Sequence, residues 1–298
     1  MIESGWLWAL FTVIAAAAQT VRNATQRELT ATLGTVGATH VRFLFGLPFS
    51  VLFLAGVLLA LDRGLPAVPA VFWPWAVFGA LTQAAATAAM LMAMGERSFV
   101  VAIAYIKTEP IQVALFGLVL LGDRLSLPLV VAILVATAGV MAVSFKPGAI
   151  AGGIRPMLIG LGAGSLFGLS AIGFRGAILS LGEPDFVMAA TVSLVVGLAV
   201  QCLVLTPYLW WRERAVLYGI LRAWRPSLFA GFMGALASQF WFLAFALASA
   251  ASVRTLALVE VLFAQAVSKF VFRQPVTARE LAGIALIVIG VALLLWAH

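Results

Sequence analysis

The sequence predicts an all-α polytopic membrane protein with ten transmembrane helices, arranged as two inverted five-helix repeats. Composition is the first observation behind this fold class. Of the 298 residues, 64% are hydrophobic and only 10% are charged, whereas a soluble domain carries about a quarter charged residues. Spacing is the second, because apolar runs of roughly 20 residues, the length that crosses a bilayer as a helix, recur along the chain. The third is an internal repeat.

The apolar runs account for almost all of the chain. Most are separated by connections of only a few residues, so no room is left for a soluble domain. The stretch 209–225 is the longest expected connection, and its mixture of tryptophan and arginine is typical of a membrane interface. The ten expected spans are 5–25, 36–61, 71–94, 99–121, 127–145, 157–180, 186–208, 226–248, 253–272 and 278–296.

An ungapped offset of 151 residues places 260–291 on 109–140, which indicates an internal repeat. We therefore expect one repeat at 1–147 and another at 153–298. An odd number of spans in each makes the second repeat enter the membrane in the opposite sense, as in many secondary transporters, whose substrate site lies between the repeats. The alternative is a chance alignment of apolar helices. The matched pairs are Glu109 with Glu260, Ser126 with Thr277 and, at an offset of 153, Arg22 with Arg175.

The formal net charge of +7 comes from lysines and arginines that lie mainly in the short connections. We expect them to anchor the protein at lipid headgroups, and we expect no binding of nucleic acid because no basic face or nucleic-acid motif is present. Most lie in odd-numbered connections, which the positive-inside rule places in the cytoplasm, with both termini outside. The even-numbered connections are expected to carry Arg63, Arg124 and Arg254.

Few residues suit metal, cofactor or catalytic chemistry. Cys202 is the single cysteine, and His40 and His298 are the only histidines. Neither an internal disulfide nor a metal site built from these side chains is expected. Catalytic signatures such as His-Glu-x-x-His and Gly-x-Ser-x-Gly are absent from the sequence. We therefore expect no cofactor and no enzymatic activity, and a membrane-embedded enzyme stays a remote alternative.

The two expected repeats end on similar motifs. Leu121-Gly122-Asp123-Arg124-Leu125-Ser126, running on to Gly139-Val140, and Phe272-Arg273-Gln274-Pro275-Val276-Thr277, running on to Gly290-Val291, resemble the repeat endings of the drug/metabolite transporter superfamily. The resemblance is to its ten-helix, EamA-type exporters, which carry a glutamate in this loop. Asp123 and Gln274 stand at that position here, so the second half lacks the carboxylate.

As a whole the chain is similar to the YddG branch of that superfamily. The resemblance implies an exporter of amino acids, including aromatic and large neutral ones, in the bacterial inner membrane. It also implies a central cavity lined by spans one, three, four, six, eight and nine, and it favours termini in the cytoplasm, against the charge count. The expected partners are a small-molecule substrate and lipid, with the protein a monomer or weak homodimer. Export of another metabolite or drug, or passive facilitation, are the alternatives.

Polar residues near the centre of the fourth span are the first candidates for a substrate site. Tyr105, Glu109 and Gln112 share one helix face, whereas Lys107 points away from Glu109. Glu109 either lines the pathway and binds an amine or a proton, or forms a structural ion pair with Lys107 or an arginine of another helix. Pro110 removes a backbone donor, which predicts a break and a hinge there.

Candidates in other spans follow the repeat. Glu260 has no cation beside it in sequence, which favours a functional role. Gln83 and Gln239 lie near the centres of matching spans, and either contact substrate or only hydrogen-bond a neighbouring helix, at about 1 kcal/mol. Trp241, with Tyr105, lines the pathway in one interpretation and faces lipid or core in the other.

Four basic residues near span ends complete the set. His40 and Arg42 either attract a carboxylate or read pH, or their head groups snorkel to the interface. The matched pair Arg22 and Arg175 either clamps a substrate carboxylate or anchors the helices at the interface.

Overall fold

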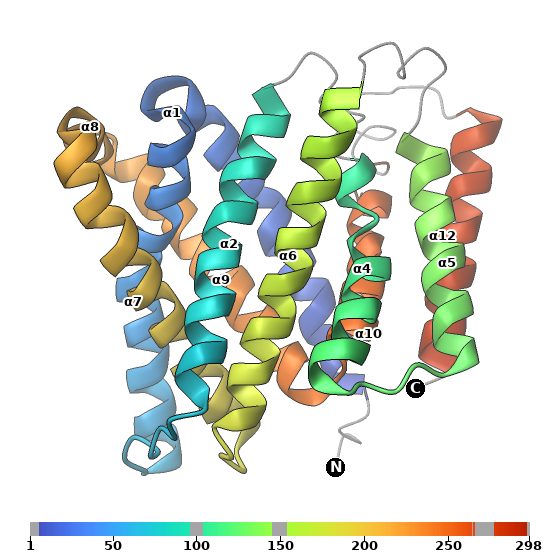
Figure 1. Ribbon diagram of the computed structural model, residues 1–298, viewed down its shortest axis with the longest axis horizontal. Coiled ribbons are helices and arrows are strands. Elements are labelled where there is room, and N and C mark those ends of the chain that lie inside the picture. The colour runs from blue at the N-terminus through green and yellow to red at the C-terminus, as the bar shows by residue number, and fades with distance from the viewer. Residues whose placement is uncertain (1–5, 96–103, 145–153, 264, 266–276, 297–298) are drawn as a thin grey trace.

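The computed structural model describes residues 6–95, 104–144, 154–263, 265 and 277–296. Its helices stand side by side in one bundle (Figure 1). Within the described residues, eight helices are long and apolar enough to cross a membrane. The elements are α1 (Leu7–Leu61), α2 (Phe72–Gly95), α4 (Glu109–Phe116), the π-helix η2 (Gly117–Leu121), α5 (Leu127–Ser144), α6 (Ile154–Ser180), α7 (Phe186–Arg212), α8 (Arg214–Arg222), α9 (Trp224–Leu247), α10 (Ala250–Leu256), the 3-10 helix η4 (Ala257–Val259) and α12 (Ala278–Trp296).

Helix α1 turns back on itself at Gly34. Its 55 residues would extend roughly 80 Å if straight, far more than the ~30 Å hydrocarbon core. Gly34 has φ 67° and ψ 175°, a region that only glycine adopts readily. The chain rises, reverses and descends in Figure 1, so α1 supplies two crossings. The loop expected between spans 5–25 and 36–61 is therefore wrong: one glycine makes the turn, and Arg22 is buried inside the helix.

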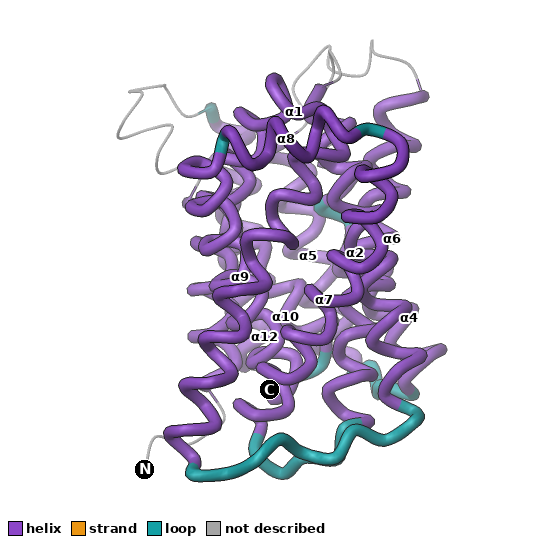
Figure 2. The backbone as a smooth tube through the Cα atoms, turned by 90° about the vertical axis from the view of Figure 1, so that its left-hand side faces the viewer, coloured by secondary structure: helices purple, strands orange, loops and turns teal. Residues whose placement is uncertain are grey.

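The connection expected at 209–225 is shorter than predicted and contains a short helix, α8. Helix α7 continues to Arg212, and α8 lies across the end of the bundle (Figure 2). Guanidinium groups stack on indoles at both ends of α8, with Arg214 4.9 Å from the Trp210 ring and Arg225 5.4 Å from the Trp224 ring. These pairs agree with the interfacial character that the sequence predicts.

The first helices of the two expected halves run in opposite directions. Figure 1 shows the first crossing of α1 rising from the end of the bundle where α12 finishes, whereas α6, which opens the second half, descends. The matched residues Ser126 and Thr277 each cap the N-terminus of a helix, α5 and α12 respectively. The Ser126 hydroxyl accepts from the Leu129 amide at 3.3 Å, and the Thr277 hydroxyl accepts from the Glu280 amide at 3.2 Å. Residues 272–276 of the second motif lie outside the described part of the chain.

Helices α5 and α12 pack backbone against backbone. A Cβ atom at Gly139 would lie 2.7 Å from the Gly283 carbonyl oxygen, and one at Gly290 would lie 2.6 Å from the Ala136 amide nitrogen. Small residues allow such close approach in lipid, where no hydrophobic force drives helices together.

Both matched glutamates follow an interruption of the α-helix. Residues 104–106 are helical, 107–108 form a turn, and α4 then begins at Glu109 with Pro110 in its first turn. This confirms the helix break predicted from Pro110. In the second half, α10 tightens into η4 just before Glu260. Subtracting the repeat offset places η4 on residues 106–108, so the two interruptions occupy equivalent positions.

Candidate functional site

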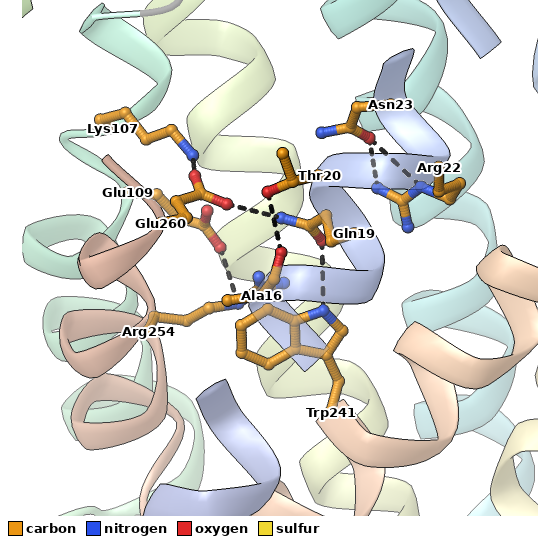
Figure 3. Close-up of polar contacts among 10 residues, drawn as sticks. All are labelled: Ala16, Gln19, Thr20, Arg22, Asn23, Lys107, Glu109, Trp241, Arg254 and Glu260. Atoms are coloured by element: carbon orange, nitrogen blue, oxygen red, sulfur yellow. Dashed lines mark hydrogen bonds and ion pairs between the residues drawn. The ribbon is translucent and has the colours of Figure 1, made fainter. Parts of the chain in front are cut away.

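Four charged side chains meet where the two interrupted helices face each other (Figure 3). Lys107 forms an ion pair with Glu260, and Arg254 Nε lies 3.0 Å from Glu109 Oε1. The second contact is an ion pair without hydrogen-bond alignment. Each glutamate is therefore neutralised by a cation from the other half of the chain, and Lys107 and Glu109 do not close on each other, as their helix positions predicted.

Gln19 and Trp241 connect this four-charge cluster to α1 and α9. The Gln19 amide nitrogen donates to Glu260 Oε2 at 3.5 Å, and its oxygen accepts from the Trp241 indole at 3.1 Å. The Arg254 guanidinium lies 4.6 Å from the Trp241 ring and 5.6 Å from the Phe245 ring. One wall beside the charges is thus aromatic, as Figure 3 shows for Trp241, and cation–π contact partly compensates the buried arginine.

The cluster encloses almost no free space. The side chains of Arg254, Glu260 and Glu109 are 9%, 10% and 13% exposed, and that of Lys107 is 22% exposed. A cavity of about 20 Å³ remains, room for about one water molecule. In this conformation the charges therefore satisfy one another, and a small metabolite enters only if the ion pairs separate. The cavity is lined by Gln19, Lys107, Glu109, Pro110, Arg254, Ala257, Leu258 and Glu260.

Other candidates of the fourth span lie at the helix interruption. The Gln112 amide donates to the Thr108 hydroxyl at 3.3 Å, and that hydroxyl donates to the Tyr105 carbonyl at 2.7 Å. Gly164 of α6 allows close packing here, since a Cβ atom on it would lie 3.1 Å from the Ile106 carbonyl oxygen. These contacts hold the turn that places Lys107 and Glu109 on opposite sides of the break.

Gln83 and Gln239 both reach α7. The Gln201 amide donates to Gln83 Oε1 at 2.9 Å, and the Gln239 amide donates to the Thr191 hydroxyl at 2.8 Å. In the described part of the chain, neither glutamine hydrogen-bonds the four-charge cluster. The structure thus shows the helix-to-helix hydrogen bonds of the structural interpretation, while a contact with substrate stays a prediction.

Basic candidates near the span ends are buried. His40 lies 3.0 Å from the Thr206 hydroxyl and is 0% exposed, so its ring does not snorkel to the interface. Arg175 donates to the carbonyls of Phe245 and Ala248 and lies 3.9 Å from Asp123. Asp123, the acidic residue of the first repeat ending, therefore balances an arginine of the second half.

Arg22 and Arg42 share one location, although neither was matched with the other in the sequence. They are 1% and 2% exposed, so neither reaches the surface as snorkelling requires. Both flank Gly234 of α9: a Cβ atom there would lie 2.9 Å from Arg42 Cγ and 3.5 Å from Arg22 Cδ.

Two residues at this location, Arg254 of the cluster and the adjoining Gln19, were not predicted from the sequence. Arg254 was expected in a connection, which is wrong: it is 8% exposed inside α10. The connection between α9 and α10 is only Ala248 and Ser249, and the uncertainty of an apolar-run boundary hid this. Gln19 is a polar residue inside the first apolar run, which was the available signal. Within the described residues, no group of three or more His, Cys, Asp or Glu side chains is placed to hold a metal ion.

Comparisons with known proteins agree with this architecture. Residues 154–296 match the model of the EamA-like transporter family. No curated protein sequence matches the chain. One solved structure, described only as the crystal structure of a protein, aligns over 98% of this chain and 97% of its own, with a TM-score of 0.65 and 14% sequence identity. That likeness shows the fold alone. Together with the apolar helices, the match makes this a multi-pass membrane protein whose residues 154–296 are similar to the EamA-like transporter family.

Proposed function

We propose that this chain is a secondary transporter that exports amino acids, including aromatic and large neutral ones, by alternating access across the bacterial inner membrane. In this proposal residues 1–147 and 153–298 are inverted five-helix repeats, and the four-charge cluster lies on the substrate path between them. The YddG branch, to which the chain is similar, has this activity. The family match gives the broader class, a membrane transporter of small substrates.

Three features support the inverted repeats. The helix interruptions before Glu109 and Glu260 occupy equivalent positions, and Ser126 and Thr277 cap equivalent helices. The halves also begin in opposite directions, as Figure 1 shows. Inverted repeats with interrupted helices at mid-depth are typical of secondary transporters.

The crossed ion pairs are the observation on which the proposal rests. Lys107–Glu260 and Arg254–Glu109 each join the two halves, so the halves separate at this place only if both pairs break. Breaking a buried pair costs about 3–5 kcal/mol, because it leaves an uncompensated charge. A zwitterion offsets that cost: its ammonium group takes the place of a cation beside a glutamate, and its carboxylate brings a negative charge to the buried cations of the same interior.

This compensation separates amino acids from the other candidate substrates. A sugar brings no charge, and a cationic drug brings one sign only, so either leaves part of the cluster unpaired. The aromatic wall of Trp241 and Phe245 is the second support, because it gives an apolar side chain a surface next to the charges. Tyr105, Gln112, Gln83 and Gln239 remain proposed substrate contacts of this pathway.

Transport by the purified protein in proteoliposomes tests the proposal. Radiolabelled amino acids, sugars and cationic drugs are compared with and without an imposed pH gradient. We expect saturable movement of amino acids that compete with one another and leave chemically unchanged. Movement of another class in the absence of any amino-acid movement would overturn the amino-acid assignment. Conversion of the compound would favour an enzyme, and failure to accumulate against a gradient under any imposed driving force would favour a facilitator.

A further inference from the structure

Arg22 and Arg42 are buried cations that receive no carboxylate from the described residues. Arg22 donates through Nε and Nη2 to the Asn23 side-chain oxygen, at 3.2 and 2.7 Å. Arg42 donates to the Thr87 hydroxyl at 3.2 Å and the Ser238 hydroxyl at 3.1 Å. All three partners are neutral, so neither positive charge is balanced by a hydrogen-bonded anion. Figure 3 shows the Arg22 contacts.

Donor groups on both arginines are left over. Arg22 Nη1 and Arg42 Nε are buried and have no hydrogen-bond partner. Because the two stems flank the same glycine, Gly234, two like charges lie close together in the protein interior. Buried donors and buried charges are normally paired, so this location is incomplete without an anion.

The other buried cations of the interior provide a contrast. Lys107 pairs with Glu260, Arg254 with Glu109, and Arg175 lies near Asp123. Among the described residues, each of the other buried cations therefore lies beside a carboxylate, whereas Arg22 and Arg42 do not. A merely structural arginine would be expected to follow the same pattern as the rest.

We propose that Arg22 and Arg42 form a buried anion site that binds the carboxylate of the transported substrate; this proposal rests on the transport function proposed above. Guanidinium groups suit the purpose, since their planar donors match the two oxygens of a carboxylate. Gln19, which donates to Glu260, lies one helical turn before Arg22 on α1. A carboxylate held by the arginines therefore directs an α-ammonium group toward Glu260.

The site sets the class of substrate. Its positive charge selects compounds with a free carboxylate, and rejects the corresponding amides and amines, because these leave the arginines unbalanced. The positioning of both stems against Gly234 also means that the spacing of the two guanidinium groups depends on α9, which carries Trp241. The same helix, α9, thus positions both the groups that bind the carboxylate and the aromatic surface beside the apolar side chain of the substrate.

Thermal unfolding of the detergent-purified protein tests the site without any transport. The probes are 3-phenylpropionate and its amide, at matched concentration and ionic strength, because a ligand raises the melting temperature according to its affinity. We expect stabilisation by the acid alone. In Arg22→Gln and Arg42→Gln the affinity for the acid falls roughly ten- to hundred-fold, as expected when a charge-assisted contact is lost. Arg63→Gln, which removes a half-exposed cation just beyond the end of α1, leaves it unchanged.

Several outcomes would overturn the site. Equal stabilisation by acid and amide would do so, as would an acid-specific effect that persists in both glutamine variants. If those variants do not fold, the wild-type comparison of acid with amide still decides, and Arg42→Lys keeps the charge while losing the planar donors, so weakened acid binding is expected there.

Amino-acid transport is measured separately, so the two proposals can fail independently. If amino acids are transported but phenylalaninamide competes as well as phenylalanine, the anion site is wrong and the transport function stands. If the acid binds through the arginines but no amino acid moves, the anion site stands and the amino-acid assignment is wrong.

Discussion

The last two crossings of each half meet their counterparts in different ways. Helices α5 and α12 touch backbone to backbone, with Gly139 and Gly283 too close for even one added carbon atom. Near them, the interrupted segments that contain α4 and α10 meet through the crossed ion pairs, each beside a helix interruption. Close backbone packing admits one arrangement only, whereas an ion pair separates when something else balances its charges. The first contact is therefore suited to a fixed joint, and the second to a gate.

The largest effect is expected from removing one partner of the gate. Glu260→Gln leaves the Lys107 ammonium without its counterion, at a cost of about 3 kcal/mol, less than for a fully buried pair because Lys107 is partly exposed. We expect the export rate in proteoliposomes to fall more than ten-fold, and Glu109→Gln to behave alike. Both variants are measured with an imposed pH gradient, and normal transport with unchanged pH dependence would contradict a role for the glutamates.

A charge swap separates a gate from a structural ion pair. Lys107→Glu combined with Glu260→Lys restores the attraction across the halves, so the melting temperature should recover most of what the single variants lose. Transport should not recover, because the carboxylate has moved away from Gln19 and Trp241. Recovery of both properties would show that the pair only holds the helices together.

The next largest effect is expected at the fixed joint. Gly139→Ala places a carbon atom 2.7 Å from backbone atoms of α12, so the helices must shift apart, at about 1–3 kcal/mol. Thermal unfolding should show a lower melting temperature. Gly162→Ala is the matched control, because nothing lies within 4 Å of its Cβ position and alanine favours a helix. Equal behaviour of the two variants would contradict the close packing.

The sequence predicted the interrupted helix, because the effect of a proline on a helix is local. It also matched Glu109 with Glu260 as corresponding positions of the repeat. It did not predict which cation meets which glutamate, since that depends on how α4 packs on α10. Arg254 was wrongly assigned to a connection, because the sequence does not reveal that only two residues join α9 to α10. The first loop was wrong for a related reason: Gly34 reverses the chain without any loop residues.

The contacts of the buried basic residues could not be predicted from the sequence either. The repeat offset matched Arg22 with Arg175, but the structure separates their roles, because Arg175 is held by carbonyls and lies near Asp123. Arg42 meets Arg22 instead, through the packing of α1 against α9 at Gly234. The repeat in the sequence therefore matched residues by position, while tertiary packing decided which residues lie together.

A smaller effect is expected from the helix break itself. Pro110 lies in the first turn of α4, where proline costs little stability. Pro110→Ala permits the helix to continue through residues 107–108, which would turn Lys107 and Glu109 from their partners. We expect the melting temperature to change by only a few degrees and the export rate to fall several-fold. Pro207→Ala in α7 is the control for removing a helix proline away from the cluster; an equal loss in both would argue against a specific role for the break.

The smallest effect is expected at the two glutamines that reach α7. Gln239→Leu removes the hydrogen bond to Thr191, yet that hydroxyl keeps its own bond to the Val187 carbonyl. The substitution leaves no further group of α7 unpaired, so the stability loss should be on the order of 1 kcal/mol or less. Gln83→Leu should behave alike, because Gln201 still donates to the Ala80 carbonyl. Unchanged export rates would mean that both glutamines only connect their helices to α7. A ten-fold loss of export at unchanged melting temperature would instead indicate that they contact the substrate.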